Sequence, residues 1–148
     1  MMLLEKQLEI RQSKIPGAGM GLFTNKPIKK ETVIIEYTGT ITTWKEVDHD
    51  EGTNVYIYYV SRNHVIDARH HKDSLARYVN DARGLQKIKG LRNNTQYVKI
   101  KRKIYLQAIT NIPAGAEIMV SYGKEYWDVI KRNMDLDRMQ MQNLAVAI

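Results

Sequence analysis

The sequence predicts a mainly β fold, and three observations support that prediction. Short apolar runs dominate the chain, and most of them are rich in the β-branched or aromatic residues that favour strands. Glycine, proline and asparagine separate these runs at short intervals, as turns require. The alternation of strand and long helix that α/β folds show is missing. Since 148 residues with 43% hydrophobic content suffice for one core but hardly for two, we expect one domain.

Nine segments are expected as strands, because each combines apolar character with flanking turn residues. In chain order they are residues 8–10, 22–23, 32–36, 40–42, 55–60, 65–68, 96–100, 104–109 and 117–120. Between the strands, a short helix is expected from Trp44 to Val47 and a helical turn from Ser74 to Val79. Residues 84–94 are expected to form a basic surface loop.

The end of the chain differs, because apolar residues recur there at helical spacing with charged residues between them. The apolar positions are Trp127, Ile130, Met134, Met141 and Leu144. They predict an amphipathic helix over residues 128–148, after a main domain of residues 1–127. We expect this helix to cover the domain or to contact a partner, which can be a second copy of the chain in a homodimer.

The composition excludes several classes of protein. With no cysteine, the chain has neither disulfides nor a cysteine-ligated zinc site. No apolar run approaches the length of a membrane span, and the opening Met-Met-Leu-Leu is too short for a signal-peptide core. A soluble, intracellular protein without a membrane partner is therefore expected. The four histidines lack ligand-like spacing with acidic residues, which favours surface positions over a metal site.

Positive charge is concentrated in one stretch of a chain whose net charge is +7. No acidic residue occurs between Ala82 and Ala116, whereas eight basic residues fall within 83–103. These are Arg83, Lys87, Lys89, Arg92, Lys99, Lys101, Arg102 and Lys103. Two interpretations stay open for residues 83–103, a solvated surface and a binding site for nucleic acid or another polyanion.

Glycines occupy every second position from Gly17 to Gly21, just before a strand-like run. Such a segment bends tightly and brings backbone amides close to a ligand. Its spacing matches neither the Gly-x-Gly-x-x-Gly of dinucleotide sites nor the Gly-Lys-Ser/Thr end of a P-loop. Taken alone, the segment indicates an ordinary turn.

Further motifs follow this turn in a fixed order. They are Glu36-Tyr37-Thr38-Gly39, Tyr56-Ile57-Tyr58-Tyr59, Val65-Ile66-Asp67-Ala68, Ala76-Arg77-Tyr78-Val79-Asn80-Asp81, Asn94-Thr95-Gln96-Tyr97 and Pro113-Ala114-Gly115 through Val120-Ser121-Tyr122-Gly123, with Tyr126-Trp127 beyond them. In this succession the chain resembles the SET-domain family of protein lysine methyltransferases, from about Leu8 to Trp127. Each motif is modest by itself, but their common order is specific.

The resemblance implies a β-clip fold of small sheets, in which the segments around Asn80 and Tyr122 pack together as a knot-like core. It also implies S-adenosylmethionine as the cofactor on one face and a target lysine on the other, meeting at a narrow aromatic channel. By position, the implied cofactor contacts are Gly17, Ala18, Gly19, Met20, Tyr56, Asn80 and Asp81, with Tyr126 or Trp127 over the adenine. The implied channel residues are Tyr37, Tyr97, Val120 and Tyr122, and Tyr122 matches the catalytic tyrosine of the family.

The implied chemistry explains why the channel needs aromatic residues. Methyl transfer needs a neutral lysine amine, and both the sulfonium charge and desolvation in a narrow channel lower the pKa of that lysine. Aromatic walls hold the aliphatic stem and attract the methylammonium product. Positioning is then the main catalytic device, with no dedicated base. The strand residues Tyr58, Tyr59 and Tyr105 are expected only to pack.

Among the departures from the family pattern, two concern Asp81 and the end of the chain. Asp81 stands where the family usually has histidine, and we expect its carboxylate to accept a hydrogen bond from the adenine amino group. The cysteines of the zinc-binding tail of many relatives are missing, and the C-terminal helix is expected to replace that tail.

The expected partner is a protein that presents a lysine, either a histone or another basic or nucleic-acid-associated protein. Two alternatives stay open. One is a non-catalytic module that binds nucleic acid or a protein partner through residues 83–103. The other is a self-associating protein built on the C-terminal helix.

Overall fold

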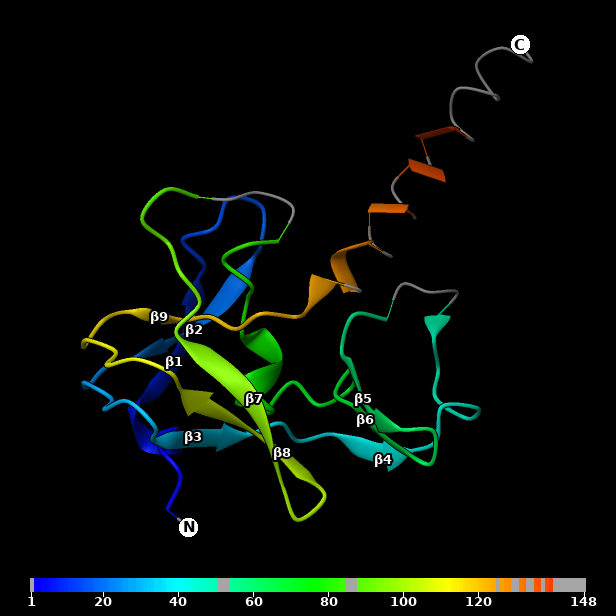
Figure 1. The fold of residues 1–148 in the computed structure, drawn as a ribbon, viewed down its shortest axis with the longest axis horizontal. Helices are drawn as coiled ribbons and strands as arrows, with labels where there is room; N and C mark the ends of the chain where they lie inside the picture. Colours follow the sequence, from blue (N-terminus) through cyan, green and yellow to red (C-terminus); the bar gives the residue numbers. More distant parts are fainter. Residues whose placement is uncertain are drawn as a thin grey trace.

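Three small antiparallel sheets form the body of the molecule in the computed structural model (Figure 1). The model describes residues 2–50, 54–84, 88–124, 126–128, 131–132, 135–136 and 138–139. The first sheet, in the order β1-β2-β9, joins β1 (Leu8–Gln12), β2 (Met20–Thr24) and β9 (Glu117–Ile118). The second, β3-β8-β7, joins β3 (Val33–Glu36), β8 (Lys103–Ala108) and β7 (Thr95–Ile100). The third, β4-β6-β5, joins β4 (Thr40–Thr42), β6 (His64–Asp67) and β5 (Ile57–Ser61).

All nine expected strands are present, with ends that differ from the prediction by no more than two residues. Short 3₁₀ helices accompany them, among them η1 (Glu5–Gln7) and η3 (Leu75–Tyr78). The second of these confirms the helical turn expected between Ser74 and Val79.

The helix expected from Trp44 to Val47 is wrong, because the chain makes only a turn there. The amides of Glu46 and Val47 donate to the carbonyl oxygen of Thr43, at 3.2 and 2.9 Å, and the pattern does not continue. Just beyond, the Asp48 side chain accepts the amide of Asp50 at 2.9 Å. Such a local side-chain bond offers the backbone an alternative to helix.

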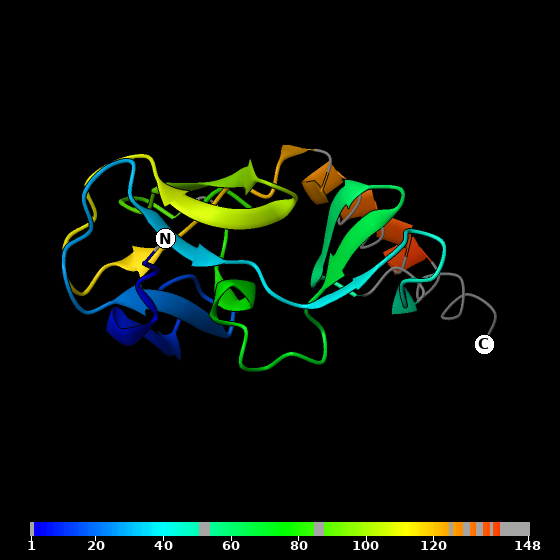
Figure 2. The same cartoon turned by 90° about the horizontal axis from the view of Figure 1, so that it is seen from below.

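One hydrophobic core is shared by the sheets and η3, and the third sheet contributes Ile66 to it. Leu22, Ile34, Leu106 and Ile118, from β2, β3, β8 and β9, are completely buried. Burial alternates along β8, as expected for a strand with one face on the core. Figure 2 shows η3 between the β1–β2 pair and the rest of the molecule, and η3 contacts β1, β2 and β3.

A knot-like arrangement joins three segments that are distant in the sequence. The amide of Val120 donates to the carbonyl oxygen of Asn80 at 2.9 Å, and the amide of Thr95 donates to that of Met119 at 3.1 Å. Both contacts belong to parallel bridges, so residues 119–120 lie between the segments of Asn80 and Thr95. Because these two residues pair with other segments, β9 is shorter than the expected strand.

The described residues beyond Gly123 are helical, and Figure 1 shows them leading away from the sheets. Leu136 and Met139 are 52% and 58% exposed. The stripe residues Ile130, Met134, Met141 and Leu144 lie outside the described residues, so the packing of the expected stripe stays a prediction. Within the described ranges, no helix has both the length and the apolar character needed to cross a membrane.

Candidate active site

Two cavities adjoin at the side chains of Tyr122 and Tyr126. The first has a volume of about 510 Å³ and the second about 480 Å³. Val55, Arg77, Tyr122 and Tyr126 line both of them. Each volume is in the range of roughly 300–1,000 Å³ that small-molecule sites occupy. The arrangement therefore offers two ligands separate places that share one wall.

The glycine-rich turn forms one side of the first cavity. Gly17 and Gly19 have φ angles of +78° and +73°, a region that favours glycine. A Cβ atom at either position would meet nothing within 4 Å, so the backbone there is open to a ligand. The neighbouring Ala18 and Met20 also line this cavity, as the resemblance implied.

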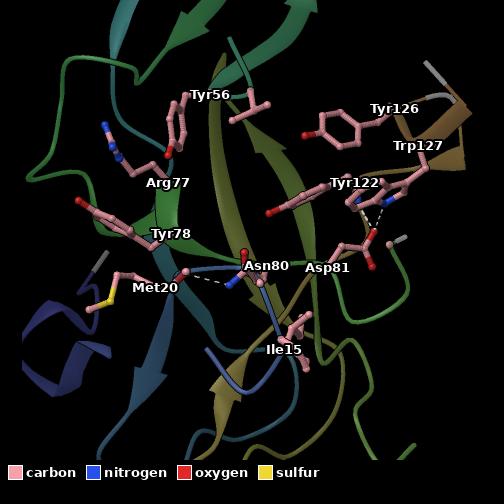
Figure 3. A pocket seen from close by; sticks show the side chains of 16 residues that line it. Ile15, Met20, Tyr56, Arg77, Tyr78, Asn80, Asp81, Tyr122, Tyr126 and Trp127 are labelled. Carbon is pink, nitrogen blue, oxygen red and sulfur yellow. Dashed lines mark hydrogen bonds between the residues drawn. The ribbon is translucent and has the colours of Figure 1, made fainter. Parts of the chain in front are cut away.

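Asn80 lies next to this turn in the first cavity (Figure 3). Its side-chain nitrogen donates to the carbonyl oxygen of Met20 at 3.0 Å and to Glu117 Oε2 at 3.4 Å. Figure 3 shows the side-chain oxygen turned away from Met20. The nitrogen is thus used within the protein, and the oxygen is left to accept a hydrogen bond from a donor.

Glu117 holds the segment that leads into the glycine-rich turn, and no motif in the sequence pointed to this residue. Its buried carboxylate accepts the Ser13 hydroxyl at 2.7 Å and the Lys14 amide at 2.8 Å. A Cβ atom on Gly21 would lie 2.4 Å from Glu117 Oε2, so only glycine allows this approach. Glu117 therefore connects β9 both to the turn and to Asn80.

Tyr56 and Arg77 form another wall of the first cavity. The Arg77 guanidinium lies 4.2 Å from the centroid of the Tyr56 ring, a cation–π distance. Its Nη1 donates to the carbonyl oxygens of Ala68 and Arg69, at 2.9 and 2.8 Å. These contacts hold a permanent cation against both cavities.

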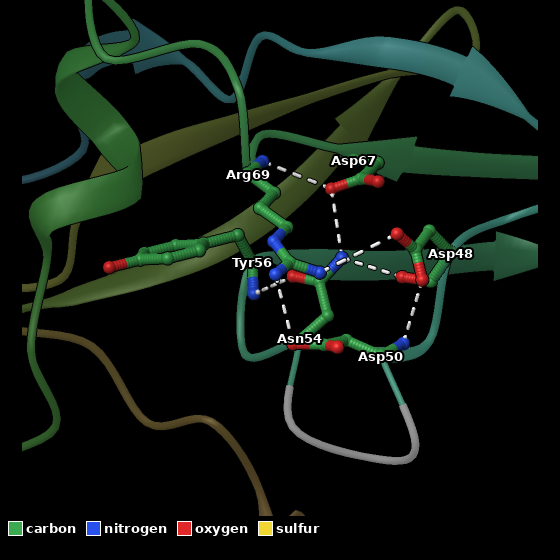
Figure 4. Close-up of polar contacts among 6 residues, drawn as sticks. All are labelled: Asp48, Asp50, Asn54, Tyr56, Asp67 and Arg69. Carbon is green, nitrogen blue, oxygen red and sulfur yellow. Dashed lines mark hydrogen bonds and ion pairs between the residues drawn. The ribbon is translucent and has the colours of Figure 1, made fainter.

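A polar network behind Tyr56 fixes its backbone (Figure 4). The amide of Tyr56 donates to Asn54 Oδ1 at 3.0 Å, and Asn54 Nδ2 donates to Asp67 Oδ1 at 3.2 Å. Arg69 adds an ion pair with Asp50 at 2.9 Å and donates its own amide to Asp67 Oδ1 at 3.0 Å. The segment that carries Tyr56 is thus tied to the end of β6.

Tyrosine rings dominate the second cavity. Tyr37, Tyr58 and Tyr97 form one cluster, with ring centroids 4.9–6.3 Å apart. The Tyr37 hydroxyl donates to the carbonyl oxygen of Tyr56 at 2.9 Å. Burial raises the pKa of Tyr37 and of Tyr97 well above the usual value for a phenol. The tyrosine walls of this cavity are therefore neutral at physiological pH, and Arg77 is the charged residue beside them.

Tyr122 lies where the two cavities meet, packed against Tyr126 and Trp127. The centroid of the Tyr122 ring lies 5.0 Å from that of Tyr126 and 5.7 Å from that of Trp127. The planes of the Tyr122 and Trp127 rings are nearly parallel, with an angle of 16° between them. The Tyr122 hydroxyl donates to the carbonyl oxygen of Val79. Burial raises the pKa of Tyr122 strongly, with Tyr126 as the next cause, so its hydroxyl stays protonated and is no base at neutral pH.

The structure brings nearly all of the predicted site residues to the expected cavity. The first cavity contains Gly17, Ala18, Gly19, Met20, Tyr56, Asn80, Asp81, Tyr126 and Trp127. The second contains Tyr37, Tyr97 and Tyr122. Val120 is different, since its side chain is only 1% exposed in the core and lines neither cavity.

Some lining residues were not expected at the site. Tyr58 and Tyr59, which were expected only to pack, line the second cavity. Arg77 and Tyr78 line the first, and their position just before Asn80 was the available signal. In the part of the chain that the structure describes, histidine, aspartate and glutamate form no group of three that could hold a metal ion.

Comparisons with known proteins agree with this geometry. The family described as SET domain matches residues 19–123. The zebrafish (Danio rerio) N-lysine methyltransferase KMT5A-A is 28% identical over 119 residues, which cover 74% of this chain and 33% of that protein. Human histone-lysine N-methyltransferase 2D is 26% identical over 118 residues, covering 74% of this chain and 2% of that protein. The chain thus spans a third or less of the length of these curated relatives.

A solved structure resembles the chain as well. The methyltransferase domain of human PR domain-containing protein 2 superposes with a TM-score of 0.57 and 26% identity, covering 79% of this chain and 77% of that one. The ordered motifs, the knot-like core and these matches lead to the same conclusion: the chain belongs to the SET domain family.

Proposed function

We propose that this protein transfers a methyl group from S-adenosylmethionine to a lysine side chain of another protein. The observation that carries the proposal is the pair of adjoining cavities, which share Tyr122 and Tyr126. One cavity has an open glycine backbone and the other has aromatic walls, so two chemically different ligands would meet at Tyr122. The zebrafish and human relatives described above are both named as lysine methyltransferases, which supports the same activity.

The residues of the first cavity fit S-adenosylmethionine chemically. The side-chain oxygen of Asn80 is suited to accept a hydrogen bond from the ammonium of the methionine part, because its nitrogen is already bonded to Met20. Tyr126 and Trp127 offer aromatic surface for the adenine. When bound there, the cofactor supplies the methyl group on its sulfonium.

The second cavity suits a lysine side chain. Tyr37, Tyr58 and Tyr97 provide neutral aromatic surface for its aliphatic stem and attract the charged product by cation–π interaction. Desolvation in the cavity lowers the pKa of the incoming amine, which favours its neutral, nucleophilic form. The hydroxyl of Tyr122, fixed on the Val79 carbonyl, positions the amine and remains protonated.

Two measurements on the purified protein test this proposal. Calorimetry with S-adenosylhomocysteine checks binding at the first cavity, and transfer of labelled methyl to a mixture of lysine-rich proteins checks the reaction. Histones and nucleic-acid-associated proteins are the substrates to try first. Absence of transfer to every lysine-containing mixture, in a protein that is folded, would favour a non-catalytic binding module.

Polyanion binding is a second proposed function, and the β7–β8 hairpin favours it. Lys101 and Arg102 form the exposed turn of this hairpin, with exposed Lys99 and Lys103 beside them. Figure 1 shows this turn at the far end of β7 from residues 88–94. The four basic residues of the hairpin therefore lie apart from Lys89 and Arg92, which belong to residues 88–94. Through the hairpin the protein would reach a substrate that is bound to nucleic acid.

A further inference from the structure

Asp81 is bonded on both carboxylate oxygens by groups of the protein itself. We infer that Asp81 is a positioning residue, which fixes Trp127 as a wall of the first cavity and does not bond the adenine amino group. This inference rests on the proposed function, since it assigns the way in which the nucleoside end of the cofactor is held. It also revises the role expected for Asp81 from the sequence.

The hydrogen bonds to Asp81 leave little capacity for a ligand. Oδ2 accepts Trp127 Nε1 at 2.7 Å and the Tyr122 amide at 2.9 Å. Oδ1 accepts the Arg83 amide at 2.8 Å and Asn93 Nδ2 at 2.9 Å. A carboxylate has about four lone-pair sites, so these donors occupy all of them. The residue is 7% exposed, which further separates its oxygens from a ligand.

The bond from Trp127 holds the indole in one place. Its ring is stacked on Tyr122 at 5.7 Å and lies against Gly84, where a Cβ atom would be 2.3 Å from Trp127 Cζ2. Glycine at position 84 is thus required for the indole to lie there. Figure 3 shows the indole of Trp127 turned toward Asp81, with the ring of Tyr122 beside it.

Asp81 connects Trp127, which forms a wall of the first cavity, with Tyr122, which lines both cavities. The same oxygen that accepts the Trp127 indole accepts the amide of Tyr122. Among the described residues of this end of the chain, Tyr126 and Trp127 contact the domain, and those between 131 and 139 are exposed. We call Asp81, Gly84 and Trp127 the indole clasp.

Asparagine at position 81 tests the clasp with almost no change of shape. Whichever way its amide turns, the nitrogen faces two N–H donors in place of an acceptor, either Trp127 and Tyr122 or Arg83 and Asn93. Trp127→Phe is the complementary variant, because it keeps an aromatic ring and removes the donor. Melting curves establish that each variant is folded.

Fluorescence reports on the clasp without any ligand. The chain has two tryptophans, and Trp44 lines neither cavity, so Trp44→Phe leaves Trp127 as the single emitter. In that background we expect Asp81→Ala, which leaves the Trp127 indole without its acceptor in any rotamer, to make Trp127 more accessible to acrylamide and to shift its emission toward the red. Unchanged quenching and emission would overturn the inference.

Calorimetry with two ligands separates positioning from direct recognition. S-adenosylhomocysteine carries the adenine amino group, and S-inosylhomocysteine lacks it. We expect Asp81→Asn to weaken both ligands by the same factor, on the order of tenfold for loss of bonds to a charged group. If Asp81 bonded the amino group directly, only S-adenosylhomocysteine would lose affinity, and the inference would be wrong.

A double-mutant cycle gives an independent check. Both single changes disturb the same hydrogen-bond network around Asp81, so the loss of ligand affinity in the Asp81→Asn/Trp127→Phe double variant should be smaller than the sum of the two single losses. Full additivity would contradict the clasp. If the parent protein binds neither ligand, the proposed function loses its cofactor, and the quenching of Trp127 still decides whether Asp81 holds the indole.

Discussion

Replacing Tyr122 with phenylalanine removes one hydroxyl and keeps the ring at the junction of the two cavities. The ring contacts with Tyr126 and Trp127, at 5.0 and 5.7 Å, do not involve the hydroxyl and should persist. The lost bond to the Val79 carbonyl should lower the free energy of unfolding by about 1 kcal/mol, the usual net value of one hydrogen bond. Methyl transfer should fall much further, by about a hundredfold, as when a preorganised polar group is removed from an active site.

Single-turnover transfer of labelled methyl to a lysine substrate, measured together with melting and with cofactor affinity, tests this prediction. Tyr105→Phe is the matched control, because Tyr105 lies in β8 and lines neither cavity. Tyr59 is unsuitable for this purpose, since it lines the second cavity. A Tyr122→Phe protein with full activity would refute the positioning role, and a rate loss explained entirely by unfolding would refute it as well.

Three further predictions follow from the site and from the charged surface. Asn80→Ala should weaken S-adenosylhomocysteine binding about ten- to a hundredfold, through loss of polar contacts in a closed site, and calorimetry showing unchanged affinity would place the cofactor elsewhere. Burial raises the pKa of Tyr37 and of Tyr97 in the folded state above the unfolded value. The free energy of unfolding that is linked to these two pKa shifts is therefore complete below pH ~10 and declines at higher pH. The decline is about 1.4 kcal/mol per tyrosine per pH unit and stops once the pH exceeds the pKa of the folded state. Urea unfolding at several alkaline pH values measures this decline, and a flat profile would contradict it. Replacing Lys101 and Arg102 with glutamine should weaken duplex DNA binding and flatten its dependence on salt. Binding that is absent at low salt, or that ignores salt, would show these charges to be only solvated.

The strands were predictable because their signal is local. The alternation of burial in β8 is visible in the sequence as alternating apolar and polar residues, and a turn on each side marks its ends. The turn at Trp44 was predicted wrongly as a helix, because Asp48 bonds the amide of Asp50 and so competes with helical hydrogen bonds. That competition depends on one side-chain rotamer, which apolar spacing does not reveal.

The order of the motifs made it possible to predict which residues line the site. It was less informative about the role of each residue. Val120 was expected in the channel, yet its bridge to Thr95 places it in the core, and neighbouring Ser121 lines the second cavity. Glu117 would be expected at the surface from its type alone. It is buried because Ser13 and the Lys14 amide bind its carboxylate from more than a hundred positions away, a contact that only the fold creates.

The threading of residues 119–120 between two other segments has a consequence for how the chain folds. β2 pairs with β9 across nearly the whole of the matched domain, and such non-local pairing makes folding slow. During synthesis, the glycine-rich turn and Asn80 leave the ribosome before Glu117 and Tyr122 exist, so β2 keeps an unpaired edge open to wrong partners. A nascent chain would therefore be inactive and prone to aggregation until Gly123 has emerged.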